Sequence, residues 1–191
     1  MNRTQPHVLL SLFDYSGNWS RPYREAGYEV IQLDKKLGID LLYWDYTQIH
    51  KPSKVLIAMP CTDYALSGAK HFARKDADGT TEKSQEIMRK VKEILDYFQP
   101  DIWCLENPMT RIHKLNPWLG EVKFKFNPYD FEDGCQKQTW LFGKFNIPVK
   151  TPGKNQGNWM YTNLGGKSER TKELRSITPL GFAYAFYEAN H

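Results

Sequence analysis

Several common features are missing from this sequence of 191 residues, and each absence excludes a class of protein. No apolar run approaches the ~20 residues that cross a bilayer. The short run VLLSLF near the start is followed at once by Asp14, so we expect neither a membrane span nor a signal peptide. The sequence has no G-x-G-x-x-G and no P-loop, which argues against dinucleotide and nucleoside triphosphate binding. Without internal repeats or a long linker, we expect one domain over residues 1–191.

Cysteine is also scarce, with Cys61, Cys104 and Cys135 only, and their spacing fits no metal site. We therefore expect reduced thiols, a cytoplasmic location and no bound metal. The sequence lacks the H-x-E and the second cysteine of zinc deaminases. A hydrophobic content of 40% indicates a globular chain, and a net charge of +4 is compatible with a polyanionic partner.

Short apolar runs alternate with helical patterns along the chain. Apolar residues recur at helical spacing between Thr80 and Phe98, where Pro100 stops the pattern, and SRPYREAGY predicts a shorter helix with Ser20 as its N-cap. This alternation predicts an α/β domain with a doubly wound, mainly parallel sheet and helices on both faces. The expected strands are residues 7–13, 29–34, 54–59, 101–107, 121–126 and 138–143.

Polar residues stand at the carboxyl ends of four of these strands, namely Asp14, Asp34, Cys61 and the pair 106–107 (Glu-Asn). In parallel sheets, ligands bind beyond the carboxyl ends of the strands. We therefore expect these side chains to meet at one edge of the sheet.

The first and second strand ends suggest a cofactor with a nucleoside. Gly17, in the turn FDYSGNWS, lets the backbone approach a ligand. Asp34 stands 17 positions later, at a strand end where an acidic side chain can bind ribose hydroxyls. The alternative is that Gly17 serves only the turn.

The third and fourth strand ends suggest covalent chemistry. Cys61 follows a proline at a strand end, where a thiol can ionise and become a nucleophile. Glu106 could act beside it as a general acid. The alternatives are a buried, unreactive cysteine and a solvated carboxylate.

Taken in order, FDYSGN, the acidic end of the second strand, MPCTDY, CLENP and QKQTWLFG resemble the DNA cytosine-5 methyltransferases. That family has an F-x-G-x-G-type loop followed by Pro-Cys-Gln, Glu-Asn-Val and Q-x-R-x-R segments. The resemblance covers residues 8–143, and RSITP (175–179) is similar to a later R-x-x-T-P segment. It implies a Rossmann-like class I methyltransferase fold, S-adenosylmethionine as cofactor and DNA as partner.

The resemblance also implies a role for each matched residue. Cys61 would add to carbon 6 of cytosine, Glu106 would donate a proton to ring nitrogen 3, and Asn107 would orient the catalytic loop. Gln136 and Lys137 would act near the target base, which a duplex would have to flip out. The implied cofactor-binding residues are Phe13, Asp14, Ser16, Gly17, Asn18, Asp34, Asp45, Tyr46 and Pro60.

The sequence departs from the family pattern in several places. Tyr15 and Asn18 stand where the family prefers glycine, Thr62 replaces a glutamine, and Gln138 and Trp140 replace two arginines. Only 34 residues, 141–174, lie between Trp140 and the RSITP segment, where the family inserts a target-recognition domain. The family's closing Gly-Asn segment is missing too. These departures predict a minimal form with low sequence specificity, which a partner protein could supplement.

Basic residues lie near the expected site and could contact phosphates. A flexible basic loop is expected over about residues 150–172. Two alternatives stay open, namely pyrimidine modification on RNA or a free nucleotide, and a non-catalytic nucleic-acid-binding relative. The basic residues are Lys70, His71, Arg74, Lys75, Lys150, Lys154, Lys167, Arg170, Lys172 and Arg175.

Overall fold

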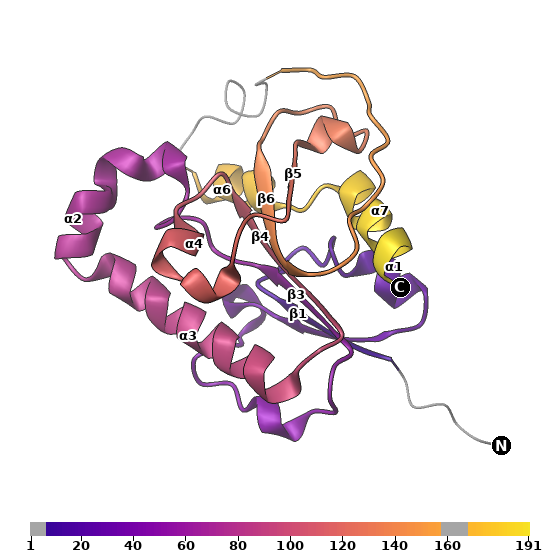
Figure 1. The fold of residues 1–191 in the computed structure, drawn as a ribbon, viewed down its shortest axis with the longest axis horizontal. Coiled ribbons are helices and arrows are strands. Elements are labelled where there is room, and N and C mark those ends of the chain that lie inside the picture. The colour runs from indigo at the N-terminus through magenta and orange to yellow at the C-terminus, as the bar shows by residue number, and fades with distance from the viewer. Residues whose placement is uncertain (1–6, 158–167) are drawn as a thin grey trace.

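Six strands form one sheet in the computed structural model, which describes residues 7–157 and 168–191 (Figure 1). The strand order is β2-β1-β3-β4-β6-β5. Strands β1 to β4 are mutually parallel, whereas β6 is antiparallel to both of its neighbours, β4 and β5. The strands are β1 (Val8–Leu12), β2 (Glu29–Leu33), β3 (Lys54–Ala58), β4 (Ile102–Pro108), β5 (Phe124–Phe126) and β6 (Thr139–Lys144).

The α/β class and the six strands were predicted from the sequence, but the sheet is mixed because β6 is reversed. Only residues 127–138 connect β5 to β6, and they contain one short 3-10 helix, η5 (Pro128–Asp130). A parallel connection needs a crossover of a dozen or more residues, usually with an α-helix. The connection only just reaches this length and contains no α-helix, which favours the antiparallel arrangement.

Helices pack on both faces of the sheet, as predicted. On one face, Met88, Val91 and Ile94 of α3 are fully buried in a core with the side chains of the central strands. On the other face, Tyr23 of α1 and Phe182 of α7 are fully buried in a second core. The α-helices are α1 (Arg21–Glu25), α2 (Phe72–Ala77), α3 (Thr80–Phe98), α4 (Ile112–Leu115), α6 (Glu169–Ser176) and α7 (Leu180–Asn190).

Four further 3-10 helices lie in the connections between these elements. They are η1 (Lys35–Leu37), η2 (Tyr46–Gln48), η3 (Leu66–His71) and η4 (Pro117–Leu119). Helix α3 has the bounds that the apolar spacing predicted, and it stops at Gln99, which takes a left-handed conformation just before Pro100.

Ser20 does not cap α1, which corrects the sequence prediction. Its side-chain oxygen accepts no capping hydrogen bond, and the hydroxyl instead donates to Oδ2 of Asp14 at 2.9 Å. The reason is that Ser20 has a helical backbone conformation (φ −83°, ψ −9°), whereas an N-cap residue is extended.

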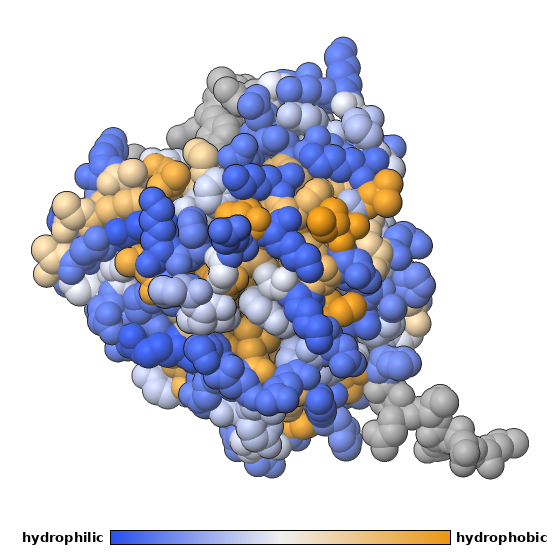
Figure 2. Space-filling model, in the orientation of Figure 1, coloured by the Kyte–Doolittle hydropathy of each residue, from blue (hydrophilic) through white to orange (hydrophobic). Residues whose placement is uncertain are grey.

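The expected basic loop over residues 150–172 falls partly on residues 158–167, which lie outside the described residues, and residues 169–172 form the first turn of α6. Among the described residues, no helix combines the length and apolar character needed to cross a membrane. The face seen in Figure 2 is mainly hydrophilic, with separate hydrophobic patches.

Candidate active site

Four parallel strands end side by side at one edge of the sheet, and each end carries residues predicted to be functional. The register pairs Leu12 of β1 with Leu33 of β2 and with Ile57 of β3, and it pairs Ala58 of β3 with Glu106 of β4. The residues that follow Leu12, Leu33 and Ala58 therefore lie at the same edge as Glu106. This is the geometry expected for a ligand site in an α/β sheet.

Asp14 organises the loop after β1. Its side chain is 3% exposed, and its Oδ2 accepts hydrogen bonds from Ser11 Oγ at 3.0 Å and from the amide of Ser20 at 3.1 Å, in addition to the Ser20 hydroxyl. Ser16 Oγ donates to the other carboxylate oxygen at 3.4 Å. The structure thus places Asp14 inside the loop as its anchor rather than at a ligand surface.

Gly17 and Asn18 complete the same turn. Gly17 has φ +68°, and a Cβ added there would lie 3.2 Å from Oε1 of Gln32, so the position favours glycine. The amide of Asn18 donates to Ser16 Oγ, and its side chain donates to the carbonyl of Thr178 at 3.2 Å. The RSITP segment therefore contacts the loop after β1, although residues 175–179 are distant in sequence.

A cavity of about 130 Å³ opens beside this loop, between β1, β2, β3 and α3. Three of the predicted cofactor-binding residues line it, namely Phe13, Asp34 and Pro60. Oδ1 of Asp34 accepts the amide of Lys36 at 2.8 Å, which fixes the carboxylate at the rim of the cavity. The other lining residues are Leu12, Leu33, Lys35, Ile39, Asp40, Leu41 and Ile87.

The acidic residue that joins Asp34 in the cavity wall is Asp40, which the sequence analysis missed. Its Oδ2 forms an ion pair with Lys35 Nζ at 2.9 Å, and this hydrogen bond is the main reason that the pKa of Asp40 lies below its ordinary value. Asp40 stands six positions after Asp34, just beyond η1 and Gly38. That short distance from a strand end was the signal that could have identified it.

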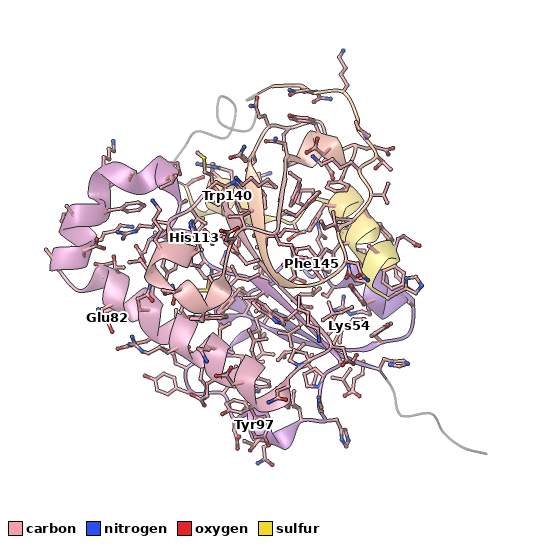
Figure 3. All side chains as sticks on the ribbon, viewed as in Figure 1. Lys54, Glu82, Tyr97, His113, Trp140 and Phe145 are labelled. Carbon is pink, nitrogen blue, oxygen red and sulfur yellow. The ribbon has the colours of Figure 1, made fainter. Side chains whose placement is uncertain are left out.

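The structure places Asp45 and Tyr46 outside this cavity. Oδ1 of Asp45 accepts the amide of Thr47 at 3.0 Å, so the side chain caps η2. The hydroxyl of Tyr46 donates to Glu93 at 2.5 Å, and its ring contacts Tyr97 edge to face. Tyr97 lies at the end of α3, well away from Trp140 in Figure 3.

Cys61 and Glu106 share one electrostatic environment at the ends of β3 and β4. Both side chains are partly buried, and burial raises the pKa of each above its ordinary value. The positive charge of Lys137 opposes this rise at both groups, while the charge of Glu106 adds to the rise at Cys61. Arg175 contributes a smaller lowering at Cys61. The ionisation of the Cys61 thiol thus depends on both the Glu106 carboxyl and the nearby cations.

Asn107 connects the two strand ends directly. Its side chain is fully buried, and Nδ2 donates to the carbonyl of Met59 at 2.9 Å, two residues before Cys61. Oδ1 of Asn107 is also buried, and it has no partner among the residues that the structure describes.

Of the residues in the QKQTW segment, Lys137 is the one whose charge acts on both Cys61 and Glu106. Its Nζ donates to the carbonyl of Arg175 at 3.0 Å. Gln136 is exposed, and its backbone amide donates to the carbonyl of Gly157.

The side chains at the two arginine positions of the family pattern contact each other. Trp140 Nε1 donates to Oε1 of Gln138 at 3.1 Å. The Trp140 ring also contacts the ring of His113, as Figure 3 shows, with Lys125 Nζ 4.6 Å from its centroid. Both of these side chains thus have partners within the chain.

The basic residues near Cys61 differ in their freedom to bind phosphate. Lys70 and His71 are exposed, and Arg74 forms an exposed ion pair with Asp78. Lys75 instead forms a mostly buried ion pair with Asp63 at 2.6 Å. The sequence predicted a solvent-facing ammonium that could contact phosphate, and the structure corrects this. Of the basic residues expected near the C-terminus, Lys167 lies outside the described residues, as does the side chain of Lys172.

Comparison with known proteins gives one informative similarity. The chain is 26% identical, over 208 aligned positions, to a protein of frog virus 3 (isolate Goorha) named probable DNA (cytosine-5)-methyltransferase. The alignment covers 90% of this chain and 94% of that protein. No family model matches the chain.

Proposed function

We propose that this chain transfers a methyl group from S-adenosylmethionine to carbon 5 of cytosine in DNA, through a covalent bond to Cys61. The observation that carries the proposal is the meeting of Cys61 and Glu106 at adjacent strand ends, both within the field of Lys137. The frog virus 3 protein supports the same activity, because it aligns with this chain over nearly its whole length.

The residues of the cavity fit a nucleoside cofactor with a positive charge. Its walls are mainly apolar, and Asp34 and Asp40 place two carboxylates at its surface. Oδ2 of Asp34 has no hydrogen-bond partner among the described residues, so it is available for a ribose hydroxyl. The volume is below the roughly 300–1,000 Å³ of pockets that enclose a whole ligand, so it suits a planar ring such as adenine. We accordingly assign the sheet to the Rossmann-like class I methyltransferase fold.

Cys61 and Glu106 would activate the pyrimidine together. The sulfur of Cys61, as thiolate, forms a bond to carbon 6, and Glu106 donates its proton to ring nitrogen 3. The electron pair that this addition leaves on the ring makes carbon 5 nucleophilic. S-adenosylmethionine, when bound, supplies an electrophilic methyl group. Removal of the carbon 5 proton by a base then allows the Cys61 sulfur to leave, and the proton on nitrogen 3 returns to Glu106.

The pKa shifts fit these roles, and they imply that the Cys61 thiol needs nearby positive charge to ionise. Because burial raises the pKa of Glu106, the carboxyl retains a proton to donate above the pH at which an exposed glutamate would lose it. Because burial also raises the pKa of Cys61, the resting thiol is protonated at neutral pH, and the cations of Lys137 and Arg175 favour its thiolate. Lys137 therefore takes the place of a missing arginine in our proposal.

Contacts with DNA would be made chiefly to phosphates. Lys70 and His71 are exposed just beyond the cysteine, and such contacts position nucleic acid without reading its sequence. We propose low sequence specificity on this ground, with a partner protein supplying any recognition. The target cytosine would have to leave the base stack to reach Cys61.

Covalent trapping tests the proposal. An oligonucleotide with 5-fluorocytosine, incubated with S-adenosylmethionine, should give a protein–DNA adduct because the fluorine cannot leave as a proton does. The variant Cys61→Ser should give none, and Cys104→Ser, which alters a fully buried thiol, should keep the adduct. Parallel methylation assays on duplex DNA, single-stranded DNA, RNA and dCMP define the substrate. Binding of DNA without any adduct would contradict the proposal and favour a non-catalytic nucleic-acid-binding protein.

A further inference from the structure

The turn that follows Cys61 is held by a buried ion pair. Lys75 Nζ, from α2, donates to the carbonyl of Thr62 at 2.7 Å and lies 2.6 Å from Oδ1 of Asp63. The Lys75 and Asp63 side chains are only 13% and 9% exposed. The second carboxylate oxygen of Asp63 accepts the hydroxyl of Ser84, from α3, at 2.5 Å. Both oxygens of one carboxylate thus tie the turn to two helices.

Arg111 holds the same turn from the side of β4. Its Nε donates to the carbonyl of Asp63 at 3.1 Å, and its amide donates to the carbonyl of Tyr64 at 2.9 Å. The guanidinium forms two hydrogen bonds of 2.7 Å to Asp76 and lies 3.6 Å from the centroid of the Phe72 ring. The pKa of Asp76 is lowered to about 2 by these bonds and one from Thr81, so this pair stays charged across the physiological pH range.

Arg111 links the two strand ends, because it contacts the turn after Cys61 and itself belongs to the segment that leaves β4 just after Glu106. The hydroxyl of Thr110 also donates to the carbonyl of Tyr64 at 3.1 Å, and the amide of Leu66 donates to the carbonyl of Met109 at 2.9 Å. The backbone after Cys61 and the backbone after Glu106 are therefore fastened to each other, with charged side chains on both sides of the contact.

We infer that Asp63, Lys75 and Arg111 form a clamp that positions Cys61 relative to Glu106. None of the three charged groups faces the cavity or interacts with the thiol as a source of its pKa shift. They act through the turn, so they are positioning residues. A buried ion pair adds little net stability compared with apolar packing, but removing one partner leaves the other charge uncompensated. The catalytic part of this inference rests on the proposed function, whereas the placement of the thiol does not.

Alkylation of Cys61 by iodoacetamide tests the placement without any substrate. Peptide mass spectrometry gives the rate at each cysteine, and the buried Cys104 and Cys135 report on general loosening of the fold. Lys75→Met should release the turn and raise the Cys61 rate by about tenfold, with the other two rates unchanged. Lys75→Arg should stay near the wild-type rate. The control Lys92→Met, which breaks an exposed ion pair with Asp96 on α3, should leave all three rates unchanged.

A double variant keeps the test valid if the single variant folds poorly. Asp63→Asn with Lys75→Met removes both charges, so no unpaired charge stays buried, yet the Asp63–Lys75 ion pair of the clamp is lost. Unchanged Cys61 alkylation in this variant would overturn the inference, and so would a parallel rise at Cys104 and Cys135.

Trapping by 5-fluorocytosine DNA gives the second readout. The adduct should form on the order of 10²-fold more slowly in the double variant, because a displaced nucleophile loses its reactive geometry. Wild-type trapping in the double variant would overturn the positioning role. If the wild-type protein itself forms no adduct, the proposed function fails, and the alkylation rates alone decide whether the clamp exists.

Discussion

The hydrogen bond from Asn107 to Met59 offers the sharpest test of how the site is assembled. Asn107→Ala removes the donor at 2.9 Å and leaves the Met59 carbonyl without it, inside the protein. Loss of one buried hydrogen-bond partner costs about 1–3 kcal/mol in the free energy of unfolding. For a chain of this size, each kcal/mol lowers the melting temperature by about 2–4 °C. We therefore expect a fall of roughly 2–12 °C, measurable by circular dichroism.

The effect on the reaction should be larger than this loss of stability implies. Met59 lies two residues before Cys61, so the strand end that carries the thiol would lose one of its attachments to β4. A displacement of about 1 Å at a reacting group can cost on the order of 10²-fold in rate. At 20 °C, where the variant is still folded, formation of the 5-fluorocytosine adduct should slow by that factor.

Asn116→Ala is the matched control. Asn116 is also buried, at 5% exposure, and its Nδ2 donates to the carbonyl of Ile112 at 3.0 Å within α4, so the substitution removes the same kind of bond away from Cys61. It should lower the melting temperature over a similar range and leave the rate of adduct formation unchanged. Equal slowing in the two variants would refute the reasoning, because the rate would then follow stability and not the position of the strand end. No slowing in Asn107→Ala would refute it too, because this hydrogen bond would then not position the thiol.

Three further variants test the charges of the site. Glu106→Gln should raise the melting temperature at pH 8 and not at pH 4, which scanning calorimetry at both pH values checks. Burial raises the pKa of Glu106, so the wild type loses stability as the pH rises and this carboxyl ionises. Lys137→Met should move the midpoint of Cys61 alkylation to higher pH, because it removes the main charge that lowers the thiol pKa; a downward shift would contradict this. Asp40→Asn should weaken binding of S-adenosylhomocysteine about tenfold in titration calorimetry, whereas Asp45→Asn should leave it unchanged; the reverse order would support the sequence-based assignment of Asp45.

Much of the fold follows from local patterns in the sequence. The apolar spacing between Thr80 and Phe98 defined α3 because a single buried stripe repeats along the helix. Strands β1 and β3 were recognisable because strands buried on both faces are nearly continuous apolar runs. The reversal of β6 was missed because strand direction depends on the connection. The lack of a helical pattern in residues 127–138 was the available signal.

The candidate site was predictable only where a residue is fixed by a strand end. Cys61 and Glu106 meet because β3 and β4 are neighbours, which the alternation of strands and helices already favoured. Asp40 and Asp45 could not be distinguished, because both stand in a segment of turns whose path is set by tertiary packing. Lys75 likewise looked like a surface cation, since its partner Asp63 is 12 positions away, on the other side of η3.

Strand order in the sheet decides whether the two halves of the site can cooperate. Neighbouring strands lie about 4.8 Å apart, so the three steps from β2 to β4 in the order β2-β1-β3-β4 span roughly 14 Å. Asp34 stands at one end of this row and Glu106 at the other, with the loop after β1 and Cys61 between them. A molecule held by its nucleoside at Asp34 would reach Cys61 past Pro60, which lines the cavity and directly precedes the thiol. Exchange of β1 and β2 in the sheet would put the loop after β1 and the Cys61 thiol two strands apart. The adjacency of β1 and β3 is thus a requirement of the methyl transfer that we propose at Cys61.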